Sequence, residues 1–235
     1  MAEVIANVEV APNIYRLKAS GAFPGRMGQF YMVRAWDSYP LLSRPLSIFN
    51  RSEEGIEFLY QVKGEGTKLL SDLRAGDELQ LEGPFGNGFP DRAIKPGGRI
   101  AVVGGGIGIA PLYYALRSWP DCDVYLGFSK EPYLTEQFKA ATQGKVNVNV
   151  GGFVLDEVDL HAYDLIVACG PEPMLAAVQQ KKLLSGSGVE VYVSLENRMA
   201  CGIGACLVCS VKCRDTRRKA CTDGPVFLAE EVIFG

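Results

Sequence analysis

The pattern of apolar and polar positions changes near the middle of the chain. In the first part, short apolar runs alternate with polar residues and are separated by Gly, Pro and Asn, which is typical of a small antiparallel β barrel. We expect strands there at residues 4–10, 14–18, 29–34, 56–62 and 78–81. A short helix is predicted at residues 67–73, with Thr67 as its N-cap.

The second part begins after a Gly- and Pro-containing linker at residues 94–98. Continuous apolar runs then alternate with helical patterns, which predicts a parallel sheet covered on both faces. The expected strands are residues 100–103, 124–128, 146–150, 165–168 and 189–193, and the expected helices are residues 111–118, 135–141 and 173–184.

The last segment is rich in Cys, Gly and Arg and shows little periodicity. It is too short and polar for a large core of its own, so we expect something other than apolar burial to hold it. The fold class is therefore an antiparallel barrel at residues 1–96, a parallel-sheet α/β domain at residues 97–194 and a small segment at residues 195–235.

Composition narrows the possible partners. The 235 residues are 48% hydrophobic and carry a formal net charge of −3, so no broad basic surface for nucleic acid or an anionic membrane is expected. The uncharged stretch at residues 100–116 contains several glycines and Pro111, and it is shorter than the ~20 residues of a membrane span. The N-terminus lacks the pattern of a signal peptide, and the cytoplasm is the expected location.

The cysteines are concentrated near one end of the chain. Cys201, Cys206 and Cys209 have the C-x4-C-x2-C spacing of plant-type [2Fe–2S] proteins, with Cys213 and Cys221 further along. A zinc site more often uses paired C-x2–4-C knuckles, and the single histidine, His161, lies far away in the sequence. The spacing favours an iron–sulfur cluster, with zinc or buried free thiols as the alternatives.

Further motifs are suited to binding phosphate groups. Residues 44–47 read Arg-Pro-Leu-Ser, and residues 64–67 place two glycines and a threonine at a helix start, where unpaired N–H groups attract anions. A glycine-rich turn at residues 104–108 and a Cys-Gly-Pro turn at residues 169–171 each follow a predicted buried strand. Each motif alone is also compatible with an ordinary turn, but ligands of open α/β sheets bind at such strand ends.

In this order, the motifs resemble the ferredoxin–NADP reductase superfamily. The Arg-Pro-Leu-Ser segment is like its R-x-[YF]-[ST] flavin motif, and the two turns of the second part are like its nicotinamide-site motifs. Residues 84–89, 196–206 and 221–227 narrow the resemblance to the electron-transfer subunits of dihydroorotate dehydrogenase B, over essentially the whole chain.

The resemblance implies roles for individual residues. FAD is expected to contact Arg44 at its pyrophosphate and Ser47 at its ring, within a site formed by Arg44, Pro45, Leu46, Ser47, Gly64, Gly66 and Thr67. The NAD site implied is Gly104, Gly106, Gly108, Cys169, Gly170 and Pro171. Ser47 and Cys169 are the residues expected beside the reacting atoms. The cluster ligands implied are Cys201, Cys206, Cys209 and Cys221.

The resemblance also implies a division of labour in pyrimidine biosynthesis. Nicotinamide carries hydride, an iron–sulfur cluster carries single electrons, and a flavin handles both. With one histidine and no group of acid–base residues, the chain is not expected to contain the dihydroorotate site. That site is expected on an FMN-containing catalytic partner, in a heterotetramer of two plus two, docked at residues 195–227.

Several alternatives remain open at this point. The chain could instead be a stand-alone NAD(P)H reductase for a small acceptor, or a zinc-stabilised binding module without enzymatic activity. Cys213 competes with Cys221 as the fourth ligand, and the basic residues between them fit either a solvated loop or a partner-facing, cluster-tuning role. No arginine pair follows residues 124–128, where Ser129, Lys130 and Glu131 stand, and this favours NAD over NADP.

Overall fold

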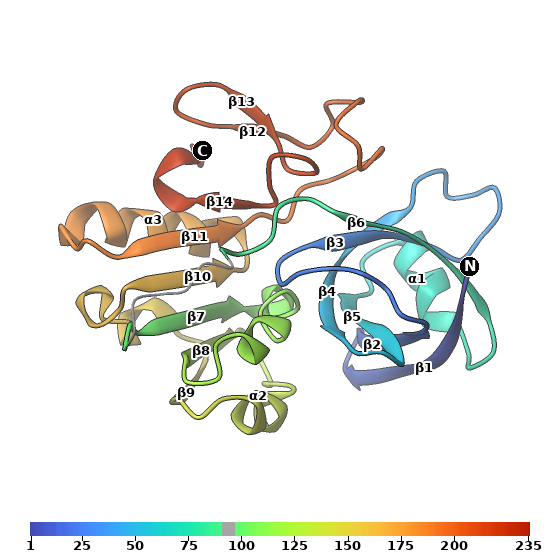
Figure 1. The fold of residues 1–235 in the computed structure, drawn as a ribbon, viewed down its shortest axis with the longest axis horizontal. Coiled ribbons are helices and arrows are strands. Elements are labelled where there is room, and N and C mark those ends of the chain that lie inside the picture. The colour runs from blue at the N-terminus through green and yellow to red at the C-terminus, as the bar shows by residue number, and fades with distance from the viewer. Residues whose placement is uncertain (91–96) are drawn as a thin grey trace.

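The computed structural model describes residues 1–90 and 97–235. Figure 1 shows a barrel beside a twisted sheet, with the C-terminal segment lying across the top of the sheet. Within the described residues, six strands close the barrel in the order β1-β2-β5-β4-β3-β6. Their bounds are β1 Ala2–Ala11, β2 Ile14–Ser20, β3 Phe30–Arg34, β4 Arg44–Arg51, β5 Gly55–Gln61 and β6 Glu78–Phe85. All neighbouring pairs in the barrel are antiparallel, as predicted.

Strand β4 is the barrel element that the sequence pattern did not predict. It carries the Arg-Pro-Leu-Ser motif and pairs Arg44 with Val33 and Ser47 with Phe30 of β3. A proline and the polar pair Asn50-Arg51 hide the alternation of this strand. Pro45 is tolerated because it lies near the start of the strand, where a missing N–H is least costly. The motif is therefore part of the barrel wall and not a free turn.

Helix α1, Glu65–Asp72, follows the barrel strand β5. Its N-cap is Gly64, and Thr67 is the third residue of the helix, so the prediction of Thr67 as N-cap is wrong. The Thr67 hydroxyl accepts hydrogen bonds from the N–H groups of Lys63 and Gly64 at 3.0 and 3.1 Å. Thr67 thus fixes the turn from inside the helix, as the third residue of a capping box does.

The second sheet has six strands in the described part of the chain, ordered β14-β11-β10-β7-β8-β9. Its strands are β7 Ile100–Gly105, β8 Asp123–Phe128, β9 Val146–Val150, β10 Leu165–Cys169, β11 Glu190–Ser194 and β14 Val226–Leu228. All pairs are parallel except β11 with β14, which makes the sheet mixed. The chain runs outward from β7 through β8 to β9 and then returns to β10 on the other side of β7, so β7 and β10 flank a topological switch point.

Helices α2, Thr135–Ala141, and α3, Glu172–Ser185, lie close to their predicted positions. The helix predicted at residues 111–118 is instead a tight turn followed by the 3₁₀ segment Tyr114–Arg117, and a second 3₁₀ segment, Gly106–Ile109, precedes it. Its hydrogen bonds join residues three apart, for example Leu112 N–H to Ile109 O at 3.1 Å. The Tyr113 ring stacks on Phe49 of the barrel at 4.7 Å, which ties these turns to the first part of the molecule.

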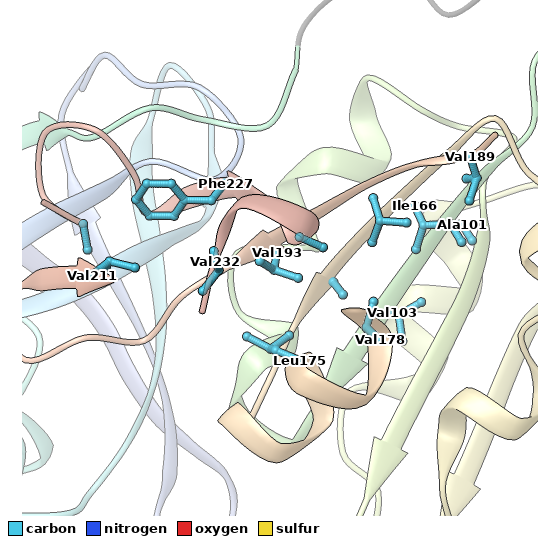
Figure 2. Packing of buried hydrophobic residues seen from close by; sticks show 14 of the residues in the cluster. Ala101, Val103, Ile166, Leu175, Val178, Val189, Val193, Val211, Phe227 and Val232 are labelled. Atoms are coloured by element: carbon cyan, nitrogen blue, oxygen red, sulfur yellow. The ribbon is translucent and has the colours of Figure 1, made fainter. Parts of the chain in front are cut away.

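The C-terminal segment shares the core of the sheet. Strands β12, Ser210–Lys212, and β13, Arg217–Lys219, form a hairpin, and a short 3₁₀ turn, Ala229–Glu231, follows β14. Figure 2 shows Val232 of this segment next to Val193, and Val211 and Phe227 belong to the same buried cluster. Apolar burial therefore contributes to holding the segment, and the expectation that something further holds it stays a prediction. Its apolar side chains pack against those of the sheet and form one core with them.

The linker and the boundary predicted after residue 96 fall largely outside the described residues, and the three-part division stays a prediction. Among the helices of residues 1–90 and 97–235, none has the length and apolar content needed to cross a membrane.

Candidate functional site

A cavity of about 810 Å³ lies between the barrel and the sheet. The barrel contributes residues 44–47 and the turn after β5, including Lys63 and Gly64. The sheet side contributes Cys169 and the turn residue Ile107, and residues 194–199 form the wall towards the cysteine segment. The structure therefore brings the flavin motif and Cys169, which are far apart in sequence, to the same cavity.

Arg44 is held from several directions. Its guanidinium lies 5.4 Å from the ring centroid of Trp36 and donates a hydrogen bond to the carbonyl of Leu42. A Cβ atom at Gly66 would stand only 2.5 Å from three guanidinium atoms, so only glycine leaves room for Arg44 at this helix start. Burial lowers the pKa of Arg44, while the Glu65 carboxylate acts in the opposite direction, and the group stays a cation.

Trp36 and Arg34 were not predicted as parts of this site. The Arg34 guanidinium lies 5.8 Å from the Trp36 ring centroid and donates to the carbonyls of Trp36, Asp37 and Leu41. These contacts fix the loop before β4, from which Arg44 starts. Their only sequence signal is an arginine and a tryptophan shortly before the Arg-Pro motif.

The glycine-rich turn and the Cys-Gly-Pro turn meet at the switch point. Gly104 pairs with Cys169 in the register of β7 and β10. A Cβ atom at Gly108 would lie 2.5 Å from the Cys169 carbonyl oxygen and 2.6 Å from the Gly170 Cα, so the two turns touch backbone to backbone. Gly106 has φ +54° with open space around it, and glycine is favoured there by its conformation. The backbone is thus bare where a pyrophosphate would approach.

Cys169 is buried at the end of β10 and lies beside Ser194 of β11. Burial raises the pKa of its thiol well above the usual value, so the side chain is a neutral thiol at physiological pH. It can border a nicotinamide ring without acting as a base. Of the other predicted NAD-site residues, Gly170 is buried and Pro171 caps helix α3.

The β12–β13 hairpin brings two cysteines together. Its register pairs Ser210 with Lys219, which places Cys209 and Cys221 at the same end of the hairpin. The Ala220 N–H donates to the Cys209 carbonyl at 2.9 Å, and the Cys209 and Cys221 sulfur atoms lie 3.2 Å apart. Cys213 is at the opposite end, bridged to Val232.

The loop before the hairpin surrounds the thiol of Cys201. Backbone N–H groups of Cys206, Ile203 and Ala205 and the Cys206 side chain point to it, and they lower the pKa of Cys201 to about 6. Burial and the neighbouring Cys209 raise the pKa of Cys221 to about 11, and the N–H of Gly204 also points to the Cys221 sulfur. The thiols thus stand as two neighbouring pairs, each near backbone donors, which is suited to a cluster with two irons and four thiolates.

The structure holds no three Cys, His, Asp or Glu side chains, within the residues it describes, that are placed to bind a single metal ion. The cysteine loop also packs on the barrel. A Cβ atom at Gly202 would lie 3.2 Å from Met32 and 3.3 Å from Phe85, and the Asn87 side chain donates to the Asp223 carbonyl at 3.0 Å. Phe30 and Met199 line the cavity between the barrel and the sheet, and they belong to the same buried cluster as Cys209 and Cys221.

Comparisons with known proteins agree with this arrangement. Residues 196–233 match the family described as the iron-sulfur cluster binding domain of dihydroorotate dehydrogenase B. A protein of Clostridium acetobutylicum named "Dihydroorotate dehydrogenase B (NAD(+)), electron transfer subunit" is 44% identical over 242 residues, which cover 99% of this chain and 96% of that protein. The chain belongs to the family of these electron transfer subunits. A member from Caldanaerobacter subterraneus subsp. tengcongensis is 40% identical, over 99% of this chain and 98% of that protein.

A solved structure supports the assignment to this family at the level of the fold. The structure of an NADH-dependent reduced ferredoxin-NADP oxidoreductase, studied for flavin-based electron bifurcation, has a TM-score of 0.86 at 26% identity and covers 100% of this chain and 90% of that chain. A ferredoxin-NADP+ reductase from Plasmodium falciparum, at 17% identity and a TM-score of 0.67, covers 83% of this chain and 95% of that chain and shows the shared fold alone. The predicted resemblance and fold class are confirmed.

Proposed function

We propose that this chain is the electron-transfer subunit of an NAD-dependent dihydroorotate dehydrogenase, with FAD and a [2Fe–2S] cluster as its cofactors and NAD as co-substrate. The observation that carries the proposal is the cavity between barrel and sheet, which has Cys169 on one wall and residues 194–199, directly before the cysteine loop, on another. When bound there, a flavin supplies the exchange between hydride and single electrons.

The residues around the cavity suit these cofactors. Arg44 offers a fixed cation with a planar fork, which matches a pyrophosphate. Pro45, Leu46, Ser47 and Gly64 line the barrel side of the same cavity. Gly66 acts through Arg44, and Thr67 acts through the turn before the helix. The Gly108–Cys169 contact presents bare backbone for NAD at the switch point.

For the cluster, the proposed ligands are Cys201, Cys206, Cys209 and Cys221. The hairpin register supports Cys221 over Cys213, because Cys221 lies beside Cys209 while Cys213 lies at the other end of the strand pair, next to Val232. The pairing of thiols with N–H donors supports bound thiolates.

The partner we propose is an FMN-containing catalytic subunit that oxidises dihydroorotate, with two copies of each chain in the complex and a cytoplasmic location. The cysteine loop exposes apolar side chains at Ile203, Leu207 and Val208, at 65%, 63% and 53% of their full area. Exposed apolar groups beside a redox site suit a docking surface, since monomeric proteins rarely leave such patches open.

The proposal is tested by purifying the full chain with and without a co-expressed catalytic subunit. We expect the chain alone to hold FAD and a [2Fe–2S] cluster and to oxidise NADH with artificial acceptors, but not to oxidise dihydroorotate. NAD-dependent dihydroorotate oxidation should require the complex. Dihydroorotate oxidation by the chain alone would contradict the division of labour, and failure to form any complex would favour a stand-alone reductase.

A further inference from the structure

Lys219 occupies a fixed position in the cysteine segment. It ends strand β13, opposite Ser210 and two residues before Cys221. Its carbonyl accepts hydrogen bonds from the N–H groups of Thr222, Asp223 and Gly224, at 3.2, 2.8 and 3.2 Å. Its own N–H donates to the Asp223 carboxylate at 2.7 Å. The backbone of Lys219 is therefore held on both sides by the turn that follows it.

The Lys219 side chain returns across this turn to the cysteine loop. A Cβ atom at Gly204 would lie 3.3 Å from the Lys219 Nζ and 3.0 Å from the Thr222 side chain. Gly204 stands between Cys201 and Cys206, and its N–H points to the sulfur of Cys221. The ammonium group thus rests against the loop segment that contacts the thiols.

The charge of this ammonium is not paired. In residues 1–90 and 97–235, no carboxylate forms an ion pair with the Lys219 Nζ, and Asp223 contacts the backbone N–H of Lys219. The neighbouring Arg218, by contrast, forms ion pairs with Asp215 at 3.1 Å and with Glu231 at 2.9 Å. Lys219 therefore contributes a positive charge at the cysteine loop, whereas the charge of Arg218 is balanced by its partners.

We propose that Lys219 raises the reduction potential of the [2Fe–2S] cluster. Reduction transfers one electron, from the flavin or from the partner subunit, to the cluster and adds one negative charge to it. A nearby fixed cation stabilises this added charge by Coulomb attraction and so favours the reduced form. The inference rests on the proposed function, because it takes Cys201, Cys206, Cys209 and Cys221 as the cluster ligands.

The test compares two neutral variants, Lys219→Gln and Lys219→Met, with Lys219→Arg, which keeps the charge. Arg217→Gln is the matched control, because Arg217 lies on the same strand and is exposed. The midpoint potential of the cluster is measured on the purified full chain by redox titration, followed by electron paramagnetic resonance.

We expect both neutral variants to keep the cluster and to lower its midpoint potential. The equilibrium constant for reduction should fall about three- to tenfold, where tenfold corresponds to about 59 mV for one electron. Lys219→Arg should retain most of the wild-type potential, and Arg217→Gln should change it little. Higher ionic strength should shrink the difference between the wild type and Lys219→Gln, because salt screens exposed charges.

An intact cluster with an unchanged potential in both neutral variants would overturn the proposal. So would loss of the cluster in both with retention in Lys219→Arg, because the charge would then hold the segment together and not set the potential. These outcomes are distinct from a failure of the proposed function, in which the wild-type chain itself would show no [2Fe–2S] signal.

Discussion

Replacing Gly66 with alanine should weaken FAD binding without weakening the fold. The added Cβ would stand 2.5 Å from three guanidinium atoms of Arg44, which is too close for any real contact. Because the atoms it meets belong to a side chain, Arg44 can leave its place beside Trp36 while the backbone of the fold stays unchanged. The backbone of Gly66 has no left-handed φ, and alanine is favoured over glycine within helices by up to about 1 kcal/mol. The protein without FAD should therefore be as stable as the wild type or more stable.

The substitution should instead lower the affinity for FAD. A hydrogen bond to a charged group contributes roughly 1.5–3 kcal/mol, so loss of the proposed contact between Arg44 and FAD should weaken FAD binding about 10- to 150-fold. The assay is a fluorescence titration of the FAD-free protein, combined with thermal unfolding of the same sample. Gly188→Ala is the control, because nothing lies within 4 Å of a Cβ atom there and the position is remote from the cavity.

A double-mutant cycle shows whether the effect runs through the arginine. Arg44→Ala alone should release FAD, and adding Gly66→Ala to it should cost little more, because both changes remove the same contact. Wild-type FAD affinity in Gly66→Ala would mean that the space around Arg44 does not control FAD binding. A fully additive loss in the double variant would show that Gly66 acts on FAD by another route.

Three further outcomes are expected. Cys221→Ser should lose or bleach the cluster, as judged by visible absorption and electron paramagnetic resonance, whereas Cys213→Ser should keep a normal signal, and the reverse result would assign the fourth ligand to Cys213. Gly108→Ala should destabilise the protein by about 1–3 kcal/mol in thermal unfolding and raise the KM for NADH, because its Cβ would meet the carbonyl of Cys169, which no side-chain movement can relieve. Cys169 should resist iodoacetamide at pH 8 in the native protein and react after denaturation, as read by mass spectrometry, because burial raises the pKa of its thiol; rapid native labelling would contradict this.

Sequence reasoning succeeded where one physical rule dominates. Strands β7 and β10 are continuous apolar runs followed by glycine turns, and this pattern identifies a buried parallel strand from local information alone. The spacing of Cys201, Cys206 and Cys209 likewise indicates a [2Fe–2S] cluster without any tertiary information.

The sequence was less informative for elements whose structure depends on tertiary contacts. Strand β4 has a weak pattern of its own and forms because β3 and β5 pair with it on both sides. The last segment lacks periodicity because its apolar residues fill gaps left by other elements. The contact of Gly66 with Arg44 joins the start of helix α1 to the start of strand β4, which only the closed barrel brings together, so no spacing rule could reveal it.

The way in which the cysteine segment is attached has a consequence for assembly. Its loop packs on Met32 and Phe85 of the barrel, its strand β14 pairs with β11, and both surfaces precede it in the chain. Such long-range contacts form late, after the elements that they join. During synthesis from the N-terminus, the barrel and strand β11 therefore fold before the cysteine loop can pack on them. Iron and sulfide should then be inserted into a protein whose barrel and sheet are already folded.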